Sequence, residues 1–448
     1  MAPHADTGAV SNGSNGHSVS SKHHATSTKG AISAESTFAA HNYHPIPVVF
    51  ARAQGVNVWD PEGKHYLDFL SAYSAVNQGH CHPELVKALT EQAGRLTLSS
   101  RAFYNDVFPV WAEKVSSVFG YDMVLPMNTG AEAVETAIKI ARKWAYKVKK
   151  VPQGKALIFS ASENFHGRTM TAISLSVDPE SRDNYGPYVP NIGAKDPVTG
   201  QVIRYNNIAD LEQVLERHGK ETAAFIVEPI QGEAGVVVPD DDYLPRVAEL
   251  CRRHNVLFIC DEIQTGIART GRMLCSEWAG VKPDIVTLGK AISGGMYPVS
   301  AVLGSREIML VVEPGTHGST YGGNPLGCAV SLRALELVEE EGLVARAEKL
   351  GNIFRDGIAK FQSPIIQTIR GKGLLNAVVI DEAAANGRTA WDLCILLKEK
   401  GLLAKPTHGN IIRFAPPLVI TEEELQKAIG IIGEALKELP NAEKGEDH

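Results

Sequence analysis

The sequence predicts an α/β protein with a mostly parallel sheet, helices on both faces of that sheet, and a smaller α+β domain at the carboxyl end. Two short apolar runs support the sheet. Residues 256–260 and 285–288 are rich in β-branched side chains, as is typical of strands buried on both faces. Polar residues follow each run, so Asp261, Gln264 and Lys290 should lie along one edge of the sheet, where open α/β folds bind ligands.

Lys290 and Asp261 have the chemistry that one cofactor requires. Apolar surroundings disfavour the ammonium form of a lysine, and a neutral amine can condense with an aldehyde. Pyridoxal phosphate needs such a lysine and a carboxylate that keeps its ring nitrogen protonated. As a single pair, the two residues are also compatible with ordinary strand ends. A Walker-type phosphate loop at Gly289 and Lys290 is excluded, because Asp284 stands where that motif requires glycine.

The composition indicates a globular enzyme that acts on small molecules. The chain has 448 residues, of which 44% are hydrophobic and 21% charged, enough for a large core. Its formal net charge of −7 argues against nucleic acid or an anionic membrane as a partner, because both select basic surfaces. The six cysteines are few for this length and are expected to be reduced thiols. No apolar run approaches the roughly 18 residues of a membrane span.

The chain should begin with a tail and an arm. Residues 1–36 are rich in Ser, Gly, His, Ala and Asn without apolar periodicity, which predicts a disordered tail. This tail has no arginine and no apolar core, which argues against a transit or signal peptide and indicates the cytoplasm. Residues 37–73 should form an N-terminal arm containing a small hairpin or meander. His80 and His82 flank Cys81, but such close neighbours rarely bind one ion, so no metal is expected.

A helix that begins within residues 128–132 has an amino end suited to an anion. The small residues Gly130 and Ala131 let backbone N–H groups approach a phosphate, and the helix dipole favours negative charge there. A plain capped helix is the alternative interpretation.

Two further strands end in polar residues. The run at 156–160 is followed by Phe165, whose ring can stack on a cofactor, and by Arg168, which can hold a carboxylate in bidentate fashion. The run at 223–227 leads to Glu233. Four strands therefore deliver polar residues to one crevice.

The loop at residues 317–325 is rich in glycine and carries the adjacent hydroxyls of Ser319 and Thr320, which suit a phosphate. A helix should follow near residue 326 and end near residue 343. The expected division of the chain is a large cofactor-binding domain at 74–344, a smaller domain at 345–440, and a short tail at 441–448.

The smaller domain has a mixed pattern. A strand is expected at 374–380, a helix at 389–400, and a last helix that Thr421 begins with a capping box. Arg413 lies in the apolar run 411–414, where it is either a paired structural arginine or an anion ligand.

Several segments resemble one known family. VEPIQGEAG, DEIQTG, TLGKAISGG and HGSTYGGNP are similar to class III pyridoxal-phosphate aminotransferases of fold type I, and the resemblance extends from about residue 43 to 439. SAYSAVNQGHCHP, MNTGAEA, GLLAKPTHG and IIRFAPPLVI narrow it to the δ-aminotransferase branch. The resemblance implies transfer of the terminal amino group of L-ornithine to 2-oxoglutarate, giving glutamate 5-semialdehyde and glutamate.

The resemblance also implies a role for each matching residue. Those that would hold the cofactor are Lys290 at its aldehyde carbon, Asp261 at its ring nitrogen, Gln264 at its phenolic oxygen, Phe165 against its ring, Gly130 and Ala131 at its phosphate, and Ser319 and Thr320 from the neighbouring subunit of a homodimer. Those that would hold substrate are Tyr43, Tyr73 and Arg168 at the far end, and Glu233 with Arg413 as a switchable pair. His166, next to Phe165, is treated as neutral for function. Lys290 would also move the proton between substrate and cofactor.

Other activities stay open. Within the fold, the alternatives are a 4-aminobutyrate or an acetylornithine aminotransferase. A pyridoxal-phosphate aminomutase or decarboxylase is a further class, and Arg413 speaks against the mutase, because an internal transfer needs no cation for a dicarboxylate acceptor. A non-catalytic binding protein would be expected to lack Lys290 or Asp261, and both are present.

Overall fold

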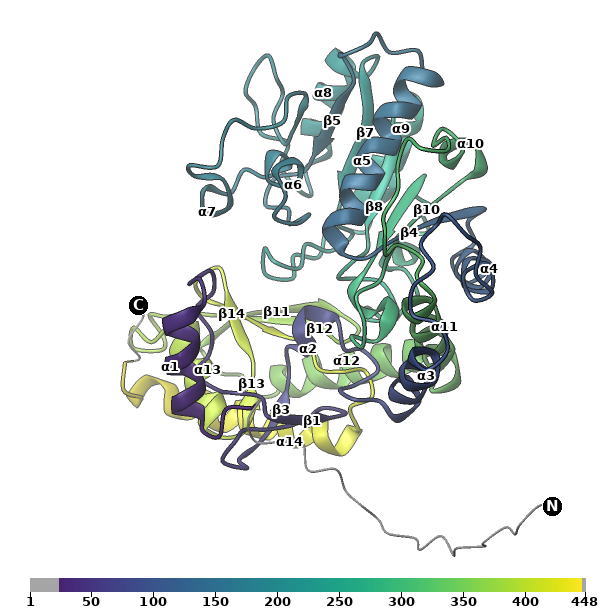
Figure 1. Ribbon diagram of the computed structural model, residues 1–448. Coiled ribbons are helices and arrows are strands. Elements are labelled where there is room, and N and C mark those ends of the chain that lie inside the picture. The colour runs from purple at the N-terminus through teal and green to yellow at the C-terminus, as the bar shows by residue number, and fades with distance from the viewer. Residues whose placement is uncertain (1–23, 445–448) are drawn as a thin grey trace, which may run out of the picture.

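The centre of the structure, a computed structural model that describes residues 24–444, is a seven-stranded sheet (Figure 1). All strands run parallel except β10, which is antiparallel to both of its neighbours, β4 and β9. In spatial order the strands are β4 (Met123–Met127), β10 (Ser300–Gly304), β9 (Ile285–Leu288), β8 (Leu257–Asp261), β7 (Thr222–Val227), β5 (Leu157–Ser160) and β6 (Ile192–Gly193). The predicted α/β class and the mostly parallel sheet are confirmed.

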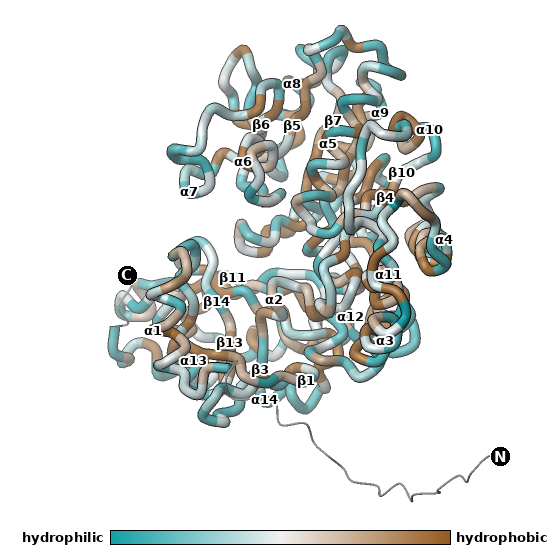
Figure 2. The backbone as a smooth tube through the Cα atoms, in the orientation of Figure 1, coloured by the Kyte–Doolittle hydropathy of each residue, from teal (hydrophilic) through white to brown (hydrophobic). Residues whose placement is uncertain are grey.

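Helices cover both faces of this sheet (Figure 1). On one face, α5 (Gly130–Lys147) packs its buried alanines against β5, β7 and β8. On the other face, α8 (Ile208–His218) and α9 (Tyr243–Arg253) cover the aromatic side chains of β7 and β8. Hydrophobic residues gather along the central strands (Figure 2), and all six residues of β7 are buried. Burial on both faces explains why these strands are continuous apolar runs.

The remaining helices around the large sheet are mostly short. They are α3 (Pro83–Ala93), α4 (Phe108–Phe119), α6 (Met170–Leu175), α7 (Pro179–Arg182), α10 (Arg306–Met309), α11 (Pro325–Glu340) and the 3₁₀ turns η2 (Cys275–Ala279) and η3 (Lys290–Ser293).

A second sheet, with four antiparallel strands, follows α12 (Leu343–Ala359). Its strands in spatial order are β11 (Ile366–Lys372), β12 (Leu375–Ile380), β15 (Ile411–Phe414) and β14 (Lys405–Thr407). The helices of this part are α13 (Ala390–Glu399), α14 (Glu422–Glu438) and the short η4 (Leu439–Asn441). The predicted capping box of Thr421 and Glu424 begins α14. The predicted division between residues 344 and 345 falls in the first turn of α12.

A third sheet joins the N-terminal arm to the C-terminal part of the chain. The arm forms the meander β1 (Arg52–Gln54), β2 (Asn57–Trp59) and β3 (His65–Asp68), and β3 pairs in parallel with β13 (Leu402–Leu403). The arm then enters α2 (Ser71–Ser74), a short turn in which four consecutive non-glycine residues have positive φ.

The predicted disordered tail at 1–36 is wrong for its last part, because α1 (Thr28–Phe38) is a helix. The side chain of Ser27 caps it by accepting from the N–H of Gly30. Thr28 donates to the carboxylate of Glu62 from both its N–H and its hydroxyl, at 2.8 and 2.6 Å. The helix buries none of its residues, so it has no apolar face that the sequence pattern could reveal. Tail residues 1–23 and 445–448 lie outside the described residues.

The histidines near residue 80 have structural partners. His80 lies 2.7 Å from the carboxylate of Asp68, and His82 lies 2.9 Å from that of Glu341. His82 also caps α3 by accepting from the N–H of Glu84. Within residues 24–444, no helix combines the length and the apolar character needed to cross a membrane.

Candidate active site

A cavity of about 220 Å³ lies at the carboxyl edge of the large sheet. It is lined by residues that follow four of the strands and by the start of α5. These residues are Gly130, Ala131, Phe165, His166, Gly167, Glu228, Asp261, Ile263, Gln264, Thr265 and Lys290. The sheet therefore brings together the predicted cofactor residues, except for Ser319 and Thr320.

Asp261 is the last residue of β8 and is buried. Its Oδ1 accepts from the hydroxyl of Thr287 and from the N–H of Ile263, both at 3.1 Å. Its Oδ2 lies 2.7 Å from Nδ1 of His166, whose side chain is fully buried. These contacts hold the carboxylate in one orientation.

His166, expected from the sequence to be neutral for function, lines the cavity and contacts Asp261 directly. Burial alone would lower the pKa of this imidazole, but the hydrogen bond to Asp261 and the charge of that carboxylate raise it above its usual value. Nδ1 of the ring contacts Asp261, while its Nε2 has no hydrogen-bond partner in residues 24–444. The position of His166 directly after Phe165 was the one available signal.

Glu228 lines the cavity together with Phe165 and His166. Its Oε2 accepts from the N–H of Phe165 at 3.0 Å, which ties the end of β7 to the segment after β5. Burial raises the pKa of Glu228 to about 7. A carboxyl group with this pKa can change its charge near neutral pH.

Lys290 begins η3 immediately after β9, with the unusual backbone angle φ of 45°. Burial lowers the pKa of its amine, although the carboxylates of Glu233 and Asp261 act in the opposite direction. A strained backbone at a functional position is common where the surrounding fold holds it in place. The neutral amine that the sequence predicted is therefore favoured.

The start of α5 provides a site for an anion. Thr129 and Glu132 form a capping box, in which the hydroxyl of Thr129 accepts from the N–H of Glu132. The N–H groups of Gly130 and Ala131 make no hydrogen bond within the described part of the chain, so both are free to bind a ligand. A side chain at position 130 would be confined, because an added Cβ would lie 3.1 Å from Ile263.

Arg413, on β15 of the second sheet, is buried and contacts Gln264, which lines this cavity. Its Nη1 donates to Oε1 of Glu233 at 2.9 Å and to Oε1 of Gln264 at 3.0 Å. The amide Nε2 of Gln264 donates to the same carboxylate oxygen at 2.9 Å. Burial would raise the pKa of Glu233, but the charge and hydrogen bond of Arg413 lower it to about 2. The predicted Glu233–Arg413 pair is formed, and Gln264 joins it, which the sequence did not indicate.

The three other predicted substrate residues differ in burial, and of these three it is Tyr73 that contacts this pair. The guanidinium of Arg413 lies 4.8 Å from the ring centroid of Tyr73, which is half-buried in the left-handed turn α2. Arg168 is exposed, with its guanidinium 5.3 Å from the ring of Phe165. Tyr43 is also exposed, and Nζ of Lys405 lies 5.6 Å from its ring.

Ser319 and Thr320 do not line the cofactor cavity of their own chain. Ser319 lines a separate cavity of about 650 Å³ with Phe108 and His317. Its hydroxyl accepts from the side chain of Asn128 at 3.0 Å. Thr320 is exposed.

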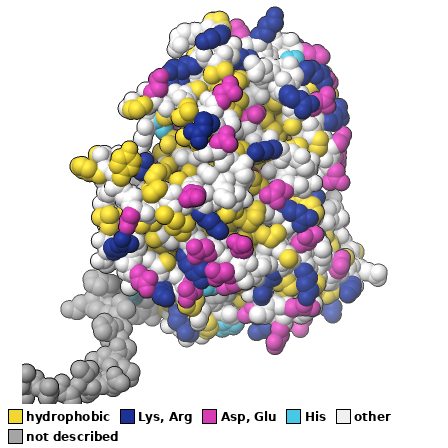
Figure 3. Space-filling view, turned by 90° about the vertical axis from the view of Figure 1, so that its right-hand side faces the viewer, with side chains coloured by type: hydrophobic (Ala, Val, Ile, Leu, Met, Phe, Trp, Pro, Cys, Tyr) yellow, Lys and Arg dark blue, Asp and Glu magenta, His cyan; other side chains and the backbone are white. Residues whose placement is uncertain are grey.

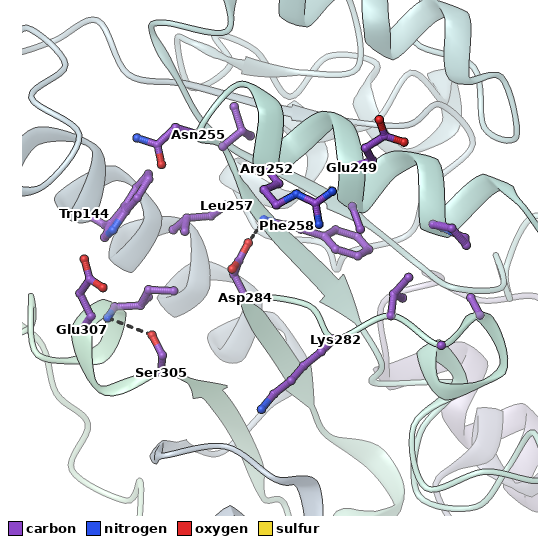
Figure 4. Close-up of a pocket in the computed structure, with 17 residues that line it drawn as sticks. Trp144, Glu249, Arg252, Asn255, Leu257, Phe258, Lys282, Asp284, Ser305 and Glu307 are labelled. Carbon is purple, nitrogen blue, oxygen red and sulfur yellow. Dashed lines mark hydrogen bonds between the residues drawn. The ribbon is translucent and has the colours of Figure 1, made fainter.

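A further cavity of about 620 Å³ lies at the opposite edge of the sheet (Figure 4). Trp144, Leu257 and Asp284 line it, near the points where β8 and β9 begin. The carboxylate of Asp284 already accepts from the N–H of Phe258 at 2.8 Å. No predicted site residue lines this cavity, and ligands of open α/β sheets bind at the carboxyl edge.

The fold and the carboxyl-edge cavity define an enzyme that works with pyridoxal phosphate. A carboxylate fixed by three contacts suits the ring nitrogen, a lysine amine whose pKa is lowered by burial suits the aldehyde, and the free N–H groups at the start of α5 suit the phosphate. Residues 38–436 match the family described as aminotransferase class-III, and the chain belongs to this family, whose cofactor is pyridoxal phosphate.

The most informative relatives carry two different names. An ornithine aminotransferase from Emericella nidulans is 72% identical and aligns over 96% of this chain and 95% of its own length. The crystal structure of the ornithine aminotransferase from Toxoplasma gondii ME49 has a TM-score of 0.88 at 46% identity, covering 93% of this chain and 96% of that one. An acetylornithine aminotransferase from Elizabethkingia anophelis has a TM-score of 0.81 at 52% identity, covering 92% and 99%.

Proposed function

We propose that this protein transfers the δ-amino group of L-ornithine to 2-oxoglutarate, giving glutamate 5-semialdehyde, which cyclises to pyrroline-5-carboxylate, and glutamate. The observation that carries the proposal is the ion pair of buried Arg413 with Glu233, both of which contact Gln264 in the lining of the cavity that holds Lys290. The relatives named as ornithine aminotransferases support the same donor. The reaction belongs to the metabolism of ornithine, proline and arginine.

At the cofactor end, each residue has a defined task. Pyridoxal phosphate, when bound, supplies an electron sink that stabilises negative charge on the substrate carbon. Asp261 presents a carboxylate to the ring nitrogen, and His166 holds that carboxylate in place. Lys290, the pKa of whose amine is lowered by burial, takes a proton at Nζ from the substrate carbon and returns it to the cofactor side.

At the substrate end, the position of Glu233 determines whether Arg413 can bind a substrate carboxylate. Paired with Glu233, Arg413 is neutralised and does not attract the carboxylate of ornithine, so ornithine presents its terminal amine toward the cofactor cavity that Lys290 lines. When Glu233 moves away, the free guanidinium binds the α-carboxylate of 2-oxoglutarate in bidentate fashion. One site thereby accepts two substrates that enter in opposite orientations.

The acetylornithine aminotransferase among the solved structures favours a second candidate donor, N2-acetyl-ornithine. This donor keeps the terminal amine and the carboxylate but has no α-ammonium. We expect half-buried Tyr73, whose ring lies 4.8 Å from the guanidinium of Arg413, to accept a hydrogen bond from the α-ammonium of ornithine.

Supplying the purified holoenzyme with 2-oxoglutarate and one donor at a time tests the proposal. The donors are L-ornithine, N2-acetyl-ornithine and 4-aminobutyrate, and the products are identified by mass spectrometry. We expect the highest kcat/KM for ornithine. A higher kcat/KM for either of the other donors would contradict the proposed function.

We also propose that the enzyme acts as a homodimer. Figure 3 shows hydrophobic side chains gathered on the face that carries α3, α4 and α11. Large apolar side chains exposed in or next to these helices are Val86, Leu96, Phe103, Tyr104, Val110 and Tyr321. Extended exposed apolar surface of this kind marks protein interfaces. Ser319 lies in a cavity of the same region and not in its own cofactor cavity, as a residue that serves the neighbouring subunit would.

Mixing two inactive variants tests whether sites are shared. Lys290→Ala and Thr320→Ala chains, dissociated and reassociated together, should regain activity, because one site of each heterodimer then has an intact Lys290 and an intact Thr320. Reassociated Lys290→Ala chains alone are the control. Absence of recovery, with subunit exchange shown by tagged chains, would exclude shared sites.

We place the reaction in the cytoplasm, on the composition of the first 36 residues, which have no arginine. Microscopy of the full chain with a fluorescent protein at its carboxyl end tests this. Fluorescence confined to an organelle would contradict it.

A further inference from the structure

The turn α2, which carries Tyr73, has a strained backbone. Its four residues have φ between 48° and 71°, and Ala72 and Tyr73 also have the ψ of a left-handed helix, 47° and 45°. Residues with a Cβ avoid this region, because the Cβ comes too close to the following carbonyl oxygen. A strained segment persists only where its surroundings hold it. The contacts that hold this turn therefore indicate which side chain it positions.

A carboxylate holds the start of the turn. Oδ1 of Asp68, which is buried, accepts from the N–H groups of Leu70 at 2.8 Å and Ser71 at 3.0 Å. Oδ2 of the same carboxylate lies 2.7 Å from Nε2 of His80. Both oxygens of Asp68 are thus in contact, and the carboxylate fixes the direction in which the chain enters the turn.

The hydroxyl of Ser71 ties the turn to the strand that carries Arg413. Ser71 is fully buried, and its Oγ donates to the backbone carbonyl of Ala415 at 2.7 Å. The N–H of Ala415 donates to the carbonyl of Phe69, also at 2.7 Å. Ala415 follows β15 directly and stands two residues beyond Arg413. Two hydrogen bonds therefore connect the segment of Tyr73 with the segment of Arg413.

The backbone beyond Ala415 is itself held on the large sheet. The carbonyl of Pro416 accepts from Nη1 of Arg269 at 2.6 Å, and the N–H of Leu418 donates to the carbonyl of Asn77 at 2.8 Å. Arg269 is fully buried, donates to Oδ1 of Asn77 as well, and follows β8 of the large sheet. The acceptor of the Ser71 hydroxyl therefore lies in a segment whose place relative to the cofactor residues is fixed.

We propose that Ser71 is a positioning residue for substrate choice. Its hydrogen bond to Ala415 holds the strained turn in the arrangement that places the ring of Tyr73 4.8 Å from the guanidinium of Arg413. The inference rests on the proposed function and deepens it, because Tyr73 is the residue expected to accept from the α-ammonium of ornithine. Without the bond, the turn relaxes and the hydroxyl of Tyr73 leaves the position from which it reaches that ammonium.

Two serines of the same turn provide a matched pair of variants. Ser71→Ala removes the hydroxyl that binds Ala415, and alanine is compatible with this backbone because Ala72 adopts a similar φ one residue later. Ser74→Ala is the control, because Ser74 is also buried and has a φ of 71°, but its hydroxyl has no hydrogen-bond partner within residues 24–444. Should Ser71→Ala not fold, Ser71→Cys takes its place, since it keeps the size of the side chain with a weaker donor.

Two donors separate an effect on Tyr73 from an effect on the fold. 5-Aminopentanoate is L-ornithine without its α-amino group, so a residue that acts through the contact with the α-ammonium should affect ornithine alone. The dissociation constant of ornithine is measured by rapid mixing in the first half-reaction of the holoenzyme. Competition with ornithine gives the constant of 5-aminopentanoate, whether or not this donor reacts.

In Ser71→Ala we expect the dissociation constant of ornithine to rise by roughly fivefold, as for the loss of one hydrogen bond. The limiting rate should change little, because the groups that contact the cofactor are unaltered. The constant of 5-aminopentanoate should keep its wild-type value, and Ser74→Ala should behave as wild type with both donors.

A double-mutant cycle tests whether Ser71 acts through Tyr73. In Tyr73→Phe the contact with the ammonium is already lost, so adding Ser71→Ala should leave the dissociation constant of ornithine unchanged. A further loss in that background would show that Ser71 acts by another route, and would overturn the assignment.

The remaining outcomes also decide against it. Equal losses for ornithine and 5-aminopentanoate, with a lowered Tm, would show a structural role alone. An unchanged constant for ornithine in Ser71→Ala would show that Asp68 suffices to hold the turn. Failure of the wild-type enzyme to react with ornithine is a separate result, because it contradicts the proposed function before any variant is compared.

Discussion

The cofactor end and the substrate end of the active site are built in different ways. At the cofactor end, Asp261, Thr287 and Lys290 come from the adjacent parallel strands β8 and β9 and from the turn that follows β9. At the substrate end, Glu233 and Gln264 follow strands of the large sheet, whereas Arg413 comes from the second sheet. Exposed Tyr43, a predicted substrate residue, comes from the N-terminal arm.

This difference in construction suits the two tasks of the site, which are to hold the cofactor and to accept two substrates. The cofactor needs one fixed geometry in both half-reactions, and neighbouring strands of one buried sheet provide it. The substrate end must accept two substrates, and an ion pair between separate parts of the fold can open and close. Replacements at the cofactor end should therefore remove activity, whereas replacements at the substrate end should change the choice of substrate.

The largest effect is expected for Lys290→Ala, which should lower kcat by at least about 10³-fold, because both the amine that condenses with the aldehyde and the proton carrier are lost. Single-turnover rates with ornithine measure this. Lys282→Ala, an exposed lysine before the other end of β9, is the matched control and should keep wild-type rates. Cofactor should remain bound to Lys290→Ala through Asp261 and α5. Turnover near the wild-type level in Lys290→Ala would refute the assignment.

At the substrate end, Glu233→Ala should leave Arg413 exposed in both half-reactions. The ratio of half-reaction rates should then shift toward glutamate and away from ornithine by at least about tenfold, because an unpaired buried charge is worth roughly 2–5 kcal/mol. Glu422→Ala, at an exposed position at the start of α14, serves as the control. If the ratio keeps its wild-type value in Glu233→Ala, the pair does not select the substrate.

His166→Asn should produce an intermediate effect at the cofactor end. The variant loses the contact that holds Oδ2 of Asp261, and we expect about a tenfold weaker binding of pyridoxal phosphate. Equilibrium dialysis of the variant against the free cofactor measures it. Unchanged affinity together with unchanged kcat would mean that Thr287 and Ile263 suffice to hold the carboxylate.

The effect of the same variant, His166→Asn, on the free energy of unfolding should depend on pH in a defined direction. The pKa of His166 is raised in the folded protein above its ordinary value of 6.5, so its pair with Asp261 stabilises the fold fully below about pH 6.5. That contribution is lost as the pH rises through the raised pKa. The difference in the free energy of unfolding between wild type and His166→Asn should therefore shrink with rising pH. A difference that grows with pH would contradict the pairing.

The smallest effect is expected for a chain that begins at Ala39. Helix α1 buries no residue, so its removal should shift Tm by less than about 3 °C and leave kcat unchanged. Thermal melting and steady-state rates measure both. Loss of folding or of activity would show that the segment before Ala39 has a role that its contacts with Glu62 do not explain.

Local sequence patterns were sufficient to predict the residues at the cofactor end of the active site. The apolar runs that became β8 and β9 are recognisable because burial on both faces demands continuous hydrophobic residues, and Asp261 and Lys290 stand where these runs end. The capping box of α5 and the small residues at its start are equally local signals. The helix α1 was missed for the converse reason, since a helix without a buried face has no apolar period.

The sequence by itself thus determined the parallel sheet, its carboxyl edge and the residues at that edge that would bind the cofactor. Only the tertiary structure decided that His166 contacts Asp261, and that Gln264 joins the pair of Arg413 and Glu233. It also decided that Ser71 ties the turn of Tyr73 to the backbone that follows Arg413. The physical reason is that secondary structure follows from neighbouring residues, whereas charge pairing depends on distance and burial, which the packing of the two sheets sets.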